Sequence, residues 1–63
     1  MKILRLTQVK EMTGLSRSTI YSKIKNNEFP KQINLGPRIV GWLEEEIEQW
    51  LITRIKNRSN PDK

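Results

Sequence analysis

The chain has 63 residues, with twelve Lys or Arg against seven Asp or Glu and a net charge of +5 at neutral pH. This length allows one small domain with a modest core. Neither cysteine nor histidine occurs, which excludes disulfides and thiolate metal sites and removes the usual ligands and bases of catalysis, so we expect neither an enzyme nor a cofactor.

The first elements in the chain are expected to be a strand and a short helix. Apolar and other side chains alternate over residues 3–6, which indicates a small strand. Thr7 is a suitable N-cap for a helix over residues 8–13, and Gly14 can end that helix in the left-handed conformation. Apolar residues three apart predict its buried face: Val9, Met12 and Leu15.

A second helix is predicted over residues 17–26. Ser16 is the expected N-cap, and the four-residue spacing of Ile20 and Ile24 places both in the core. Asn27 tolerates the positive φ that stops a helix. The other faces of this helix carry hydroxyl and cationic side chains, with no carboxylate before Glu28.

After this helix the chain is expected to form a hairpin. Phe29-Pro30 favours extended backbone, because the residue before a proline avoids the α region, and Phe29 is expected in the core. Residues 32–35 and 39–42 predict two short strands, and Gly36-Pro37-Arg38 predicts the turn between them.

The last element is expected to be a helix that begins near residue 44. Three consecutive glutamates, residues 44–46, place negative charge in its first turn, where the helix dipole favours it. Ser59-Asn60-Pro61 is expected to stop it, and we interpret Trp42 and Trp50 as packing residues. Apolar residues with helical spacing predict its buried face: Leu43, Ile47, Trp50, Leu51 and Ile55.

Two short helices around a glycine-containing turn indicate a helix-turn-helix motif. A helix in the major groove of DNA needs one apolar edge for anchoring and donors on its other faces, and carboxylates there would be repelled by phosphates. Residues 1–43 carry eight cationic side chains against two carboxylates, so the positive field surrounds this helix. The hairpin resembles the wing of a winged helix, with Lys31 at its base and Arg38 at its tip.

No apolar run approaches the length of a membrane span, and the N-terminus lacks the long apolar core of a signal peptide. We therefore expect a cytoplasmic protein without a membrane partner. The expected fold is mainly α with a small β-hairpin, a winged helix-turn-helix of three helices plus wing over residues 3–57. A disordered tail is expected over residues 58–63.

The segments TGLSRSTIY, FPK and VGWLEEEIEQWL together resemble the AlpA family of short phage-type transcriptional regulators, which is similar to the excisionase and MerR-like winged helix-turn-helix group. The resemblance covers about residues 3–54 and implies a sequence-specific regulator of prophage or mobile-element DNA. This sequence departs from the family at Asn27, where glycine is common, and at Ile39, where a small polar residue is common. The resemblance places the start of the recognition helix at Ser16, Arg17, Ser18, Thr19 and Tyr21, and the wing at Gly36 and Arg38.

The predicted partner is double-stranded DNA, with a second copy of the chain as a dimer or tandem array, because one recognition helix has a limited footprint. Two alternatives stay open: an excisionase-type architectural DNA-binding factor and a small basic protein-interaction module that docks on an acidic partner. The predicted DNA-contacting residues are Ser16, Arg17, Ser18, Thr19, Tyr21, Ser22, Lys23, Lys25, Lys31, Gly36 and Arg38.

Overall fold

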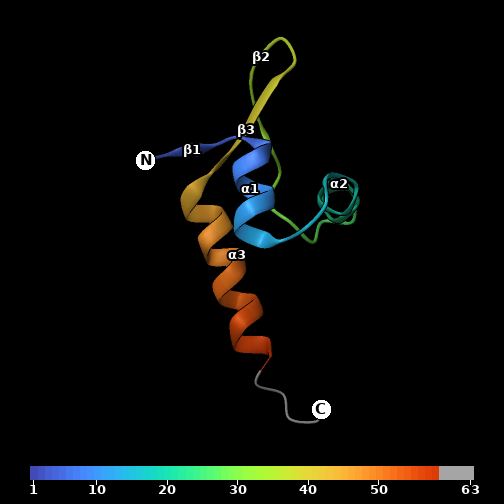
Figure 1. The fold of residues 1–63 in the computed structure, drawn as a ribbon, viewed down its shortest axis with the longest axis vertical. Helices are drawn as coiled ribbons and strands as arrows, with labels where there is room; N and C mark the ends of the chain where they lie inside the picture. The colour runs from blue at the N-terminus through green and yellow to red at the C-terminus, as the bar shows by residue number, and fades with distance from the viewer. Residues whose placement is uncertain (59–63) are drawn as a thin grey trace.

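A computed structural model describes residues 1–58 of the chain. Three helices and three strands follow one another in the order shown in Figure 1. Their bounds are β1 (Ile3–Leu4), α1 (Leu6–Thr13), α2 (Arg17–Lys25), β2 (Ile33–Gly36), β3 (Ile39–Leu43) and α3 (Glu44–Asn57). The predicted stop at Ser59-Asn60-Pro61 and nearly all of the expected tail over 58–63 lie outside the described residues.

The strands form one antiparallel sheet in the order β1-β3-β2. The predicted hairpin is confirmed, since Ile33 pairs with Gly41 and Asn34 with Val40. The pairing of β1 with β3, which sets Ile3 opposite Leu43, was not predicted. The fold is therefore three helices with a three-stranded sheet, and not helices with an isolated hairpin.

The start of α1 differs from the prediction. The strand ends at Leu4 instead of residue 6, and α1 begins at Leu6, so Thr7 lies in the first turn and is not the cap. Arg5 is the N-cap, and its backbone N–H donates to Gln8 Oε1 at 2.9 Å. The side chain that accepts this hydrogen bond thus belongs to a residue of the helix itself. A prediction based on a capping hydroxyl before the helix misses it.

The end of α1 follows the prediction, whereas one of its core assignments is wrong. Gly14 has φ 74°, and its N–H donates to the carbonyl of Lys10 at 2.8 Å. Met12 was expected in the core but is 38% exposed. The buried face of α1 centres on Val9 and continues to Thr13, whose hydroxyl donates to the Val9 carbonyl, so Met12 falls beside it.

Helix α2 has the predicted cap and end. Ser16 Oγ accepts a hydrogen bond from the Thr19 N–H at 3.2 Å. The helix is complete at Lys25, and Asn27 takes φ 60°. The N–H groups of Asn27 and Glu28 donate to the carbonyls two and three residues before the C-cap, at 3.0 and 2.7 Å, which is a Schellman arrangement.

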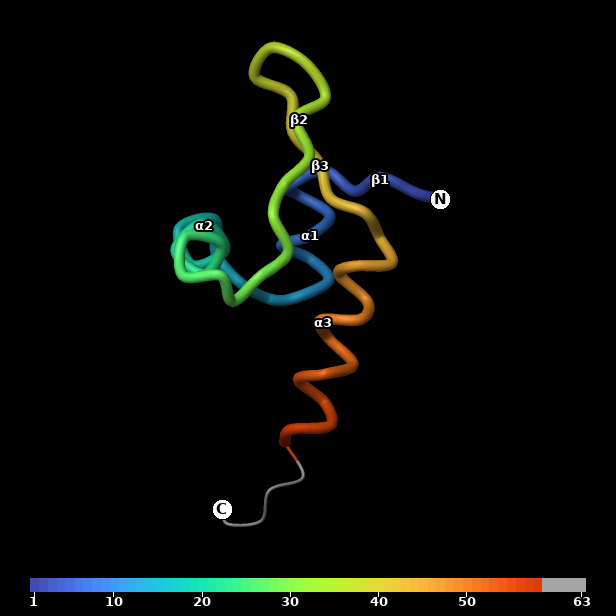
Figure 2. The backbone as a smooth tube through the Cα atoms, turned by 180° about the vertical axis from the view of Figure 1, so that it is seen from behind, coloured from blue at the N-terminus to red at the C-terminus, as the bar shows by residue number. Residues whose placement is uncertain are grey.

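The core draws on every helix and on the sheet. Its buried members are Leu4, Val9, Ile20, Phe29, Trp42 and Ile47. Ile24, Leu15 and Trp50 are partly buried and pack against this cluster. Ile55, assigned to the packed face of α3, is 52% exposed. Figures 1 and 2 show α2 set apart from α1 and α3, so its place depends on a thin apolar edge and on the segments at its two ends.

Within residues 1–58, no helix is both long enough and apolar enough to cross a bilayer.

Candidate nucleic-acid interface

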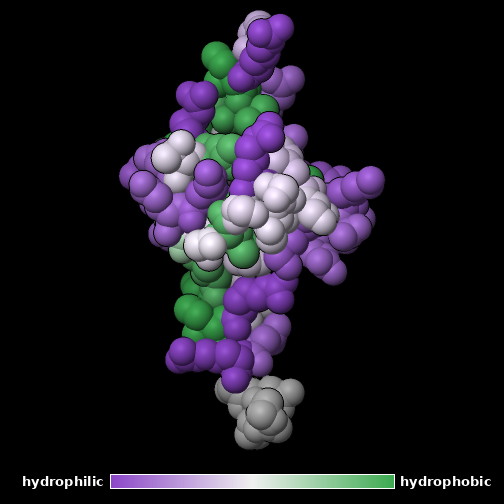
Figure 3. All heavy atoms as spheres, turned by 45° about the vertical axis from the view of Figure 1, so that its right-hand side comes forward, coloured by the Kyte–Doolittle hydropathy of each residue, from purple (hydrophilic) through white to green (hydrophobic). Residues whose placement is uncertain are grey.

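The eleven predicted contact residues fall on α2, on the segment after it and on the β2–β3 hairpin, which we call the wing. Ser16 and seven residues of α2 form the first group, and Lys31, Gly36 and Arg38 form the second. Figure 3 shows hydrophilic and near-neutral side chains over the face that carries α2. The exposed members of the α2 group are Ser16, Arg17, Ser18, Ser22 and Lys25, and the half-buried ones are Thr19, Tyr21 and Lys23.

Hydroxyl groups cluster at the N-terminus of α2. The Ser16 hydroxyl donates to Thr19 Oγ1 at 2.9 Å and lies 3.4 Å from the Ser18 hydroxyl. No acidic residue occupies the first turn of α2, so no side-chain carboxylate there offsets the positive end of the helix dipole. Ser16 and Thr19 are thus engaged in capping, which leaves Ser18 and Arg17 as the groups best placed to reach outward.

Arg17 is held against an aromatic ring. Its guanidinium carbon lies 5.3 Å from the centroid of the Tyr21 ring, within cation–π range. Tyr21 in turn lies 6.4 Å, centroid to centroid, from Trp42, which is fully buried on β3. The half-buried Tyr21 thus contacts both the Arg17 guanidinium and the buried Trp42 ring.

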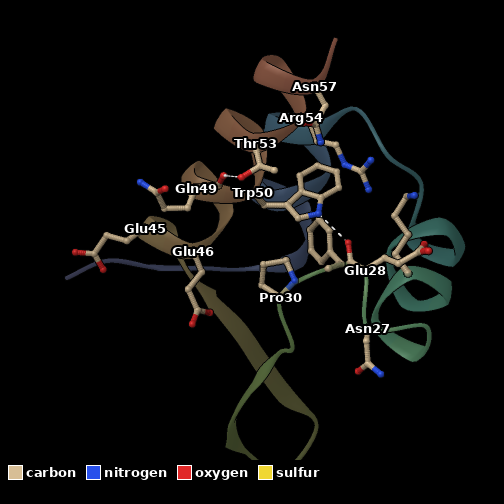
Figure 4. A pocket seen from close by; sticks show the side chains of 12 residues that line it. Asn27, Glu28, Pro30, Glu45, Glu46, Gln49, Trp50, Thr53, Arg54 and Asn57 are labelled. Atoms are coloured by element: carbon tan, nitrogen blue, oxygen red, sulfur yellow. Dashed lines mark hydrogen bonds between the residues drawn. The ribbon is translucent and has the colours of Figure 1, made fainter. Parts of the chain in front are cut away.

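The two lysines of α2 differ in their surroundings. Lys25 is exposed in the last turn, whereas Lys23 is half-buried and lines a groove between the end of α2 and α3. This groove, drawn in Figure 4, measures about 890 Å³ and also contains Glu28, Glu45 and Glu46. The carboxylates at its rim make it a poor path for a phosphate backbone.

The wing holds its arginine in an unusual backbone conformation. Arg38 has φ 61°, and a proline followed by a positive-φ residue is the arrangement of a type II turn, where glycine or asparagine is favoured. Leu35 is an extra residue in β2, since Asn34 pairs with Val40 and Gly36 with Ile39. The Gly36 N–H donates to Asn34 Oδ1 at 3.2 Å, so Gly36 shapes the turn.

Apolar side chains also lie on the wing. Leu35 is 44% exposed and Ile39 is 39% exposed, and both lie within four residues of Arg38 along the sequence. Apolar groups reach the surface at the hairpin end of the molecule in Figure 3. Neither side chain was among the predicted DNA-contacting residues.

Two indole hydrogen bonds were also missed. The Trp42 Nε1–H donates to the Pro30 carbonyl at 3.1 Å, and the Trp50 Nε1–H donates to the Glu28 carbonyl at 2.8 Å. Both acceptors lie on the segment between α2 and the wing. The need of a packed indole for a hydrogen-bond acceptor was the available signal, although it does not say which carbonyl would be used.

The part of the chain that the structure describes contains no group of three or more Asp, Glu, His or Cys side chains able to hold a metal ion. The arrangement offers cations, hydroxyl groups and backbone amides, which are groups that bind phosphates and base edges.

Comparison with known proteins decides the family. The family model described as prophage CP4-57 regulatory protein (AlpA) matches residues 2–55, which include every strand, α1, α2 and most of α3. The chain belongs to the AlpA family. This is a family of regulatory proteins, and not of enzymes.

Two relatives support the assignment. An uncharacterized protein, ORF88, of Enterobacteria phage P4 is 46% identical over 57 residues, which cover 90% of this chain and 65% of the phage protein. The DNA-binding transcriptional activator AlpA of Escherichia coli (strain K12) is 43% identical over 61 residues, 87% of each chain. The chain thus spans slightly less than two thirds of the first relative and most of the second.

Proposed function

We propose that this AlpA-family protein binds double-stranded DNA sequence-specifically as a winged helix-turn-helix and regulates transcription in a prophage or mobile element. The observation that carries the proposal is the N-terminal half of α2, whose first residues, Arg17 and Ser18, are exposed. It combines Arg17, supported by Tyr21, with hydroxyl groups and a first turn that lacks acidic residues. The relative in Escherichia coli, named a DNA-binding transcriptional activator, supports the same function.

In this proposal α2 enters the major groove. Arg17 and Ser18 meet base edges, since the first residues of a recognition helix read bases and a bidentate Arg–guanine pair is the commonest specific contact. Tyr21 supports the Arg17 guanidinium and Thr19 bonds the capping Ser16, so both lie beside the duplex at the start of the helix. The remaining polar members of the set lie against phosphates, Lys23 from outside the acidic groove that it lines: Ser16, Ser22, Lys23, Lys25 and Lys31.

The wing supplies the second contact. Arg38 stands exposed at the tip of the hairpin and reaches a phosphate or the minor groove, where arginine is favoured. Gly36 lets the hairpin backbone approach the duplex, since it has no side chain. The protein acts where bacterial DNA lies, in the cytoplasm.

A second copy of the chain completes the site in this proposal, as a dimer or a tandem array on DNA. A single recognition helix reads only a few base pairs, which gives one domain limited affinity and specificity.

One observation favours an excisionase-type architectural role as a second candidate. Exposed Leu35 and Ile39 flank Arg38 on the wing. Proteins that bend DNA often insert apolar side chains at the minor groove beside cationic ones. An end-to-end distance measurement on a labelled duplex tests this role: marked shortening favours the architectural factor, and an unchanged distance contradicts it.

Binding to a duplex of random sequence at low salt, followed by selection of a preferred site from a randomised library, tests the proposal. Roughly 4–6 phosphate contacts per domain predict a slope of log K against log[salt] of about −4 to −5. A basic module that docks on a protein need bind no DNA, so absent affinity for both duplexes, or a slope near zero, contradicts the proposal.

A further inference from the structure

The segment that joins α2 to the wing decides how these two elements are placed. It covers residues 26–32, between the last residue of α2 and the first of β2. Figures 1 and 2 show α2 and the wing as separate projections of the molecule. If both bind one duplex, the angle between them must match the spacing of the grooves, and this segment sets the angle.

Two tryptophans from different elements hold this segment at alternate residues. Trp50, on α3, donates its indole N–H to the Glu28 carbonyl at 2.8 Å. Trp42, on β3, donates its own to the Pro30 carbonyl at 3.1 Å. The intervening Phe29 is 5% exposed and lies edge-on to the Trp50 ring, with 4.8 Å between the ring centroids. The segment is therefore fixed on both sides of a buried anchor.

Trp50 packs at the edge of the core, and its hydrogen bond lies near the surface. Its ring is half-buried, and the Arg54 guanidinium carbon lies 4.9 Å from the ring centroid. Figure 4 shows the indole reaching from α3 to the segment that carries Glu28 and Pro30. Trp42, by contrast, is fully buried and also supports Tyr21, so its replacement would disturb the whole fold.

We infer that Trp50 is a positioning residue for DNA recognition: with Trp42, its indole N–H fixes residues 28–30 and thereby the orientation of α2 relative to the wing. This inference rests on the proposed function for its effect on binding. Loss of the N–H leaves Phe29 packed but releases the Glu28 carbonyl. Binding then has to fix the orientation of α2 relative to the wing before both can enter their grooves, and this loss of conformational freedom weakens binding.

The informative variant is Trp50→Phe, which keeps an aromatic ring and removes the donor. We expect its melting temperature to change by only a few degrees, its affinity for random DNA by less than about twofold and its affinity for the selected site to fall about 5- to 20-fold. Thr53→Val is the matched control. It removes a side-chain hydrogen bond to a backbone carbonyl within α3, beside the same groove, and leaves residues 28–30 untouched.

A second replacement isolates the N–H from the shape of the ring. Benzothienylalanine at position 50 substitutes sulfur for the N–H group in a ring of nearly the same size. We expect it to behave as Trp50→Phe does. Wild-type affinity for the selected site with this residue, or equal losses on selected and random DNA in Trp50→Phe, overturns the inference, since packing or stability would then explain the effect.

Residual dipolar couplings measured on the free protein test the geometry without DNA. In Trp50→Phe the couplings of α2 and of the wing should no longer fit one alignment tensor in the wild-type orientation, whereas Thr53→Val should preserve it. An unchanged orientation in Trp50→Phe overturns the inference. A wild-type protein without preference among DNA sequences would instead contradict the proposed function, and the couplings would still decide the role of Trp50.

Discussion

Gly41 lies directly against Ile3, the first residue of β1. A Cβ atom on Gly41 would stand 2.6 Å from Ile3 Cγ2 and 3.0 Å from the Leu4 carbonyl oxygen. A contact of 2.6 Å would force Ile3 to shift, so the absence of a side chain at residue 41 lets β1 lie close to β3 in the antiparallel pair. Gly41 thus lies beside the pairing that joins β1 to β3 as the third strand of the sheet.

Gly41→Ala should lower the free energy of unfolding by about 1–3 kcal/mol, because the added methyl group forces β1 away from β3. Chemical denaturation measures the change. Gly36→Ala is the matched control in the same sheet, since the nearest atom to its added Cβ is 3.8 Å away and its φ is not positive. Equal losses in the two variants would contradict the role assigned to the Gly41–Ile3 contact.

The local features of α2 were predictable from the sequence because each depends on a few neighbouring residues. Ser16 caps the helix by a bond to Thr19, three residues on, and Asn27 takes the positive φ that ends it. Gly14 similarly ends α1. Caps and left-handed turns are encoded within four or five residues, so one sequence is enough to place them.

The features that depend on distant parts of the chain were not predictable. The pairing of β1 with β3 joins Leu4 to Trp42 through a strand of two residues, too short to give a pattern. The indole bonds from Trp42 and Trp50 reach carbonyls 12 and 22 residues away. The exposure of Met12 follows from how α1 is rotated about its axis against the sheet. Residue spacing alone does not decide whether Met12 or the neighbouring Thr13 faces the core.

The contrast between Ile20 and Met12 tests how α2 is anchored. Ile20 is fully buried, so Ile20→Ala should cost about 2–5 kcal/mol, enough to unfold a large fraction of a domain this small. Met12→Ala should cost far less, because the Met12 side chain is 38% exposed. Circular dichroism melting curves measure both. A larger loss for Met12→Ala than for Ile20→Ala would contradict the described core.

Arg38 should show opposite effects on stability and on binding. A non-glycine residue at φ 61° is strained by roughly 1–2 kcal/mol, so Arg38→Gly should hold or raise the melting temperature. The same change removes a cation from the wing and should weaken binding to selected and random DNA alike, with a salt slope smaller by about 1. Arg38→Ala is the control, since it removes the charge and keeps the strain. Lower stability in Arg38→Gly than in Arg38→Ala would contradict the strained turn.

Arg17 should determine sequence preference, whereas Arg38 contributes general affinity. Arg17→Ala should cost about 1–3 kcal/mol on the selected site and much less on random DNA, because only a contact to a base edge distinguishes the two. Its melting temperature should change little, since Arg17 is exposed and its contact with Tyr21 is a surface one. Binding to a series of single-base variants of the selected site, at two salt concentrations, measures the effect.

The matched control for Arg17→Ala is Lys25→Ala, which removes a cation from the exposed last turn of the same helix. It should weaken binding to every sequence by a similar factor and leave the order of preference among the single-base variants unchanged, as expected for a phosphate contact. Arg17→Ala should flatten that order at one or two base pairs. If Arg38→Ala alone erases the preference while Arg17→Ala acts uniformly, then the wing reads the bases and α2 serves as the anchor.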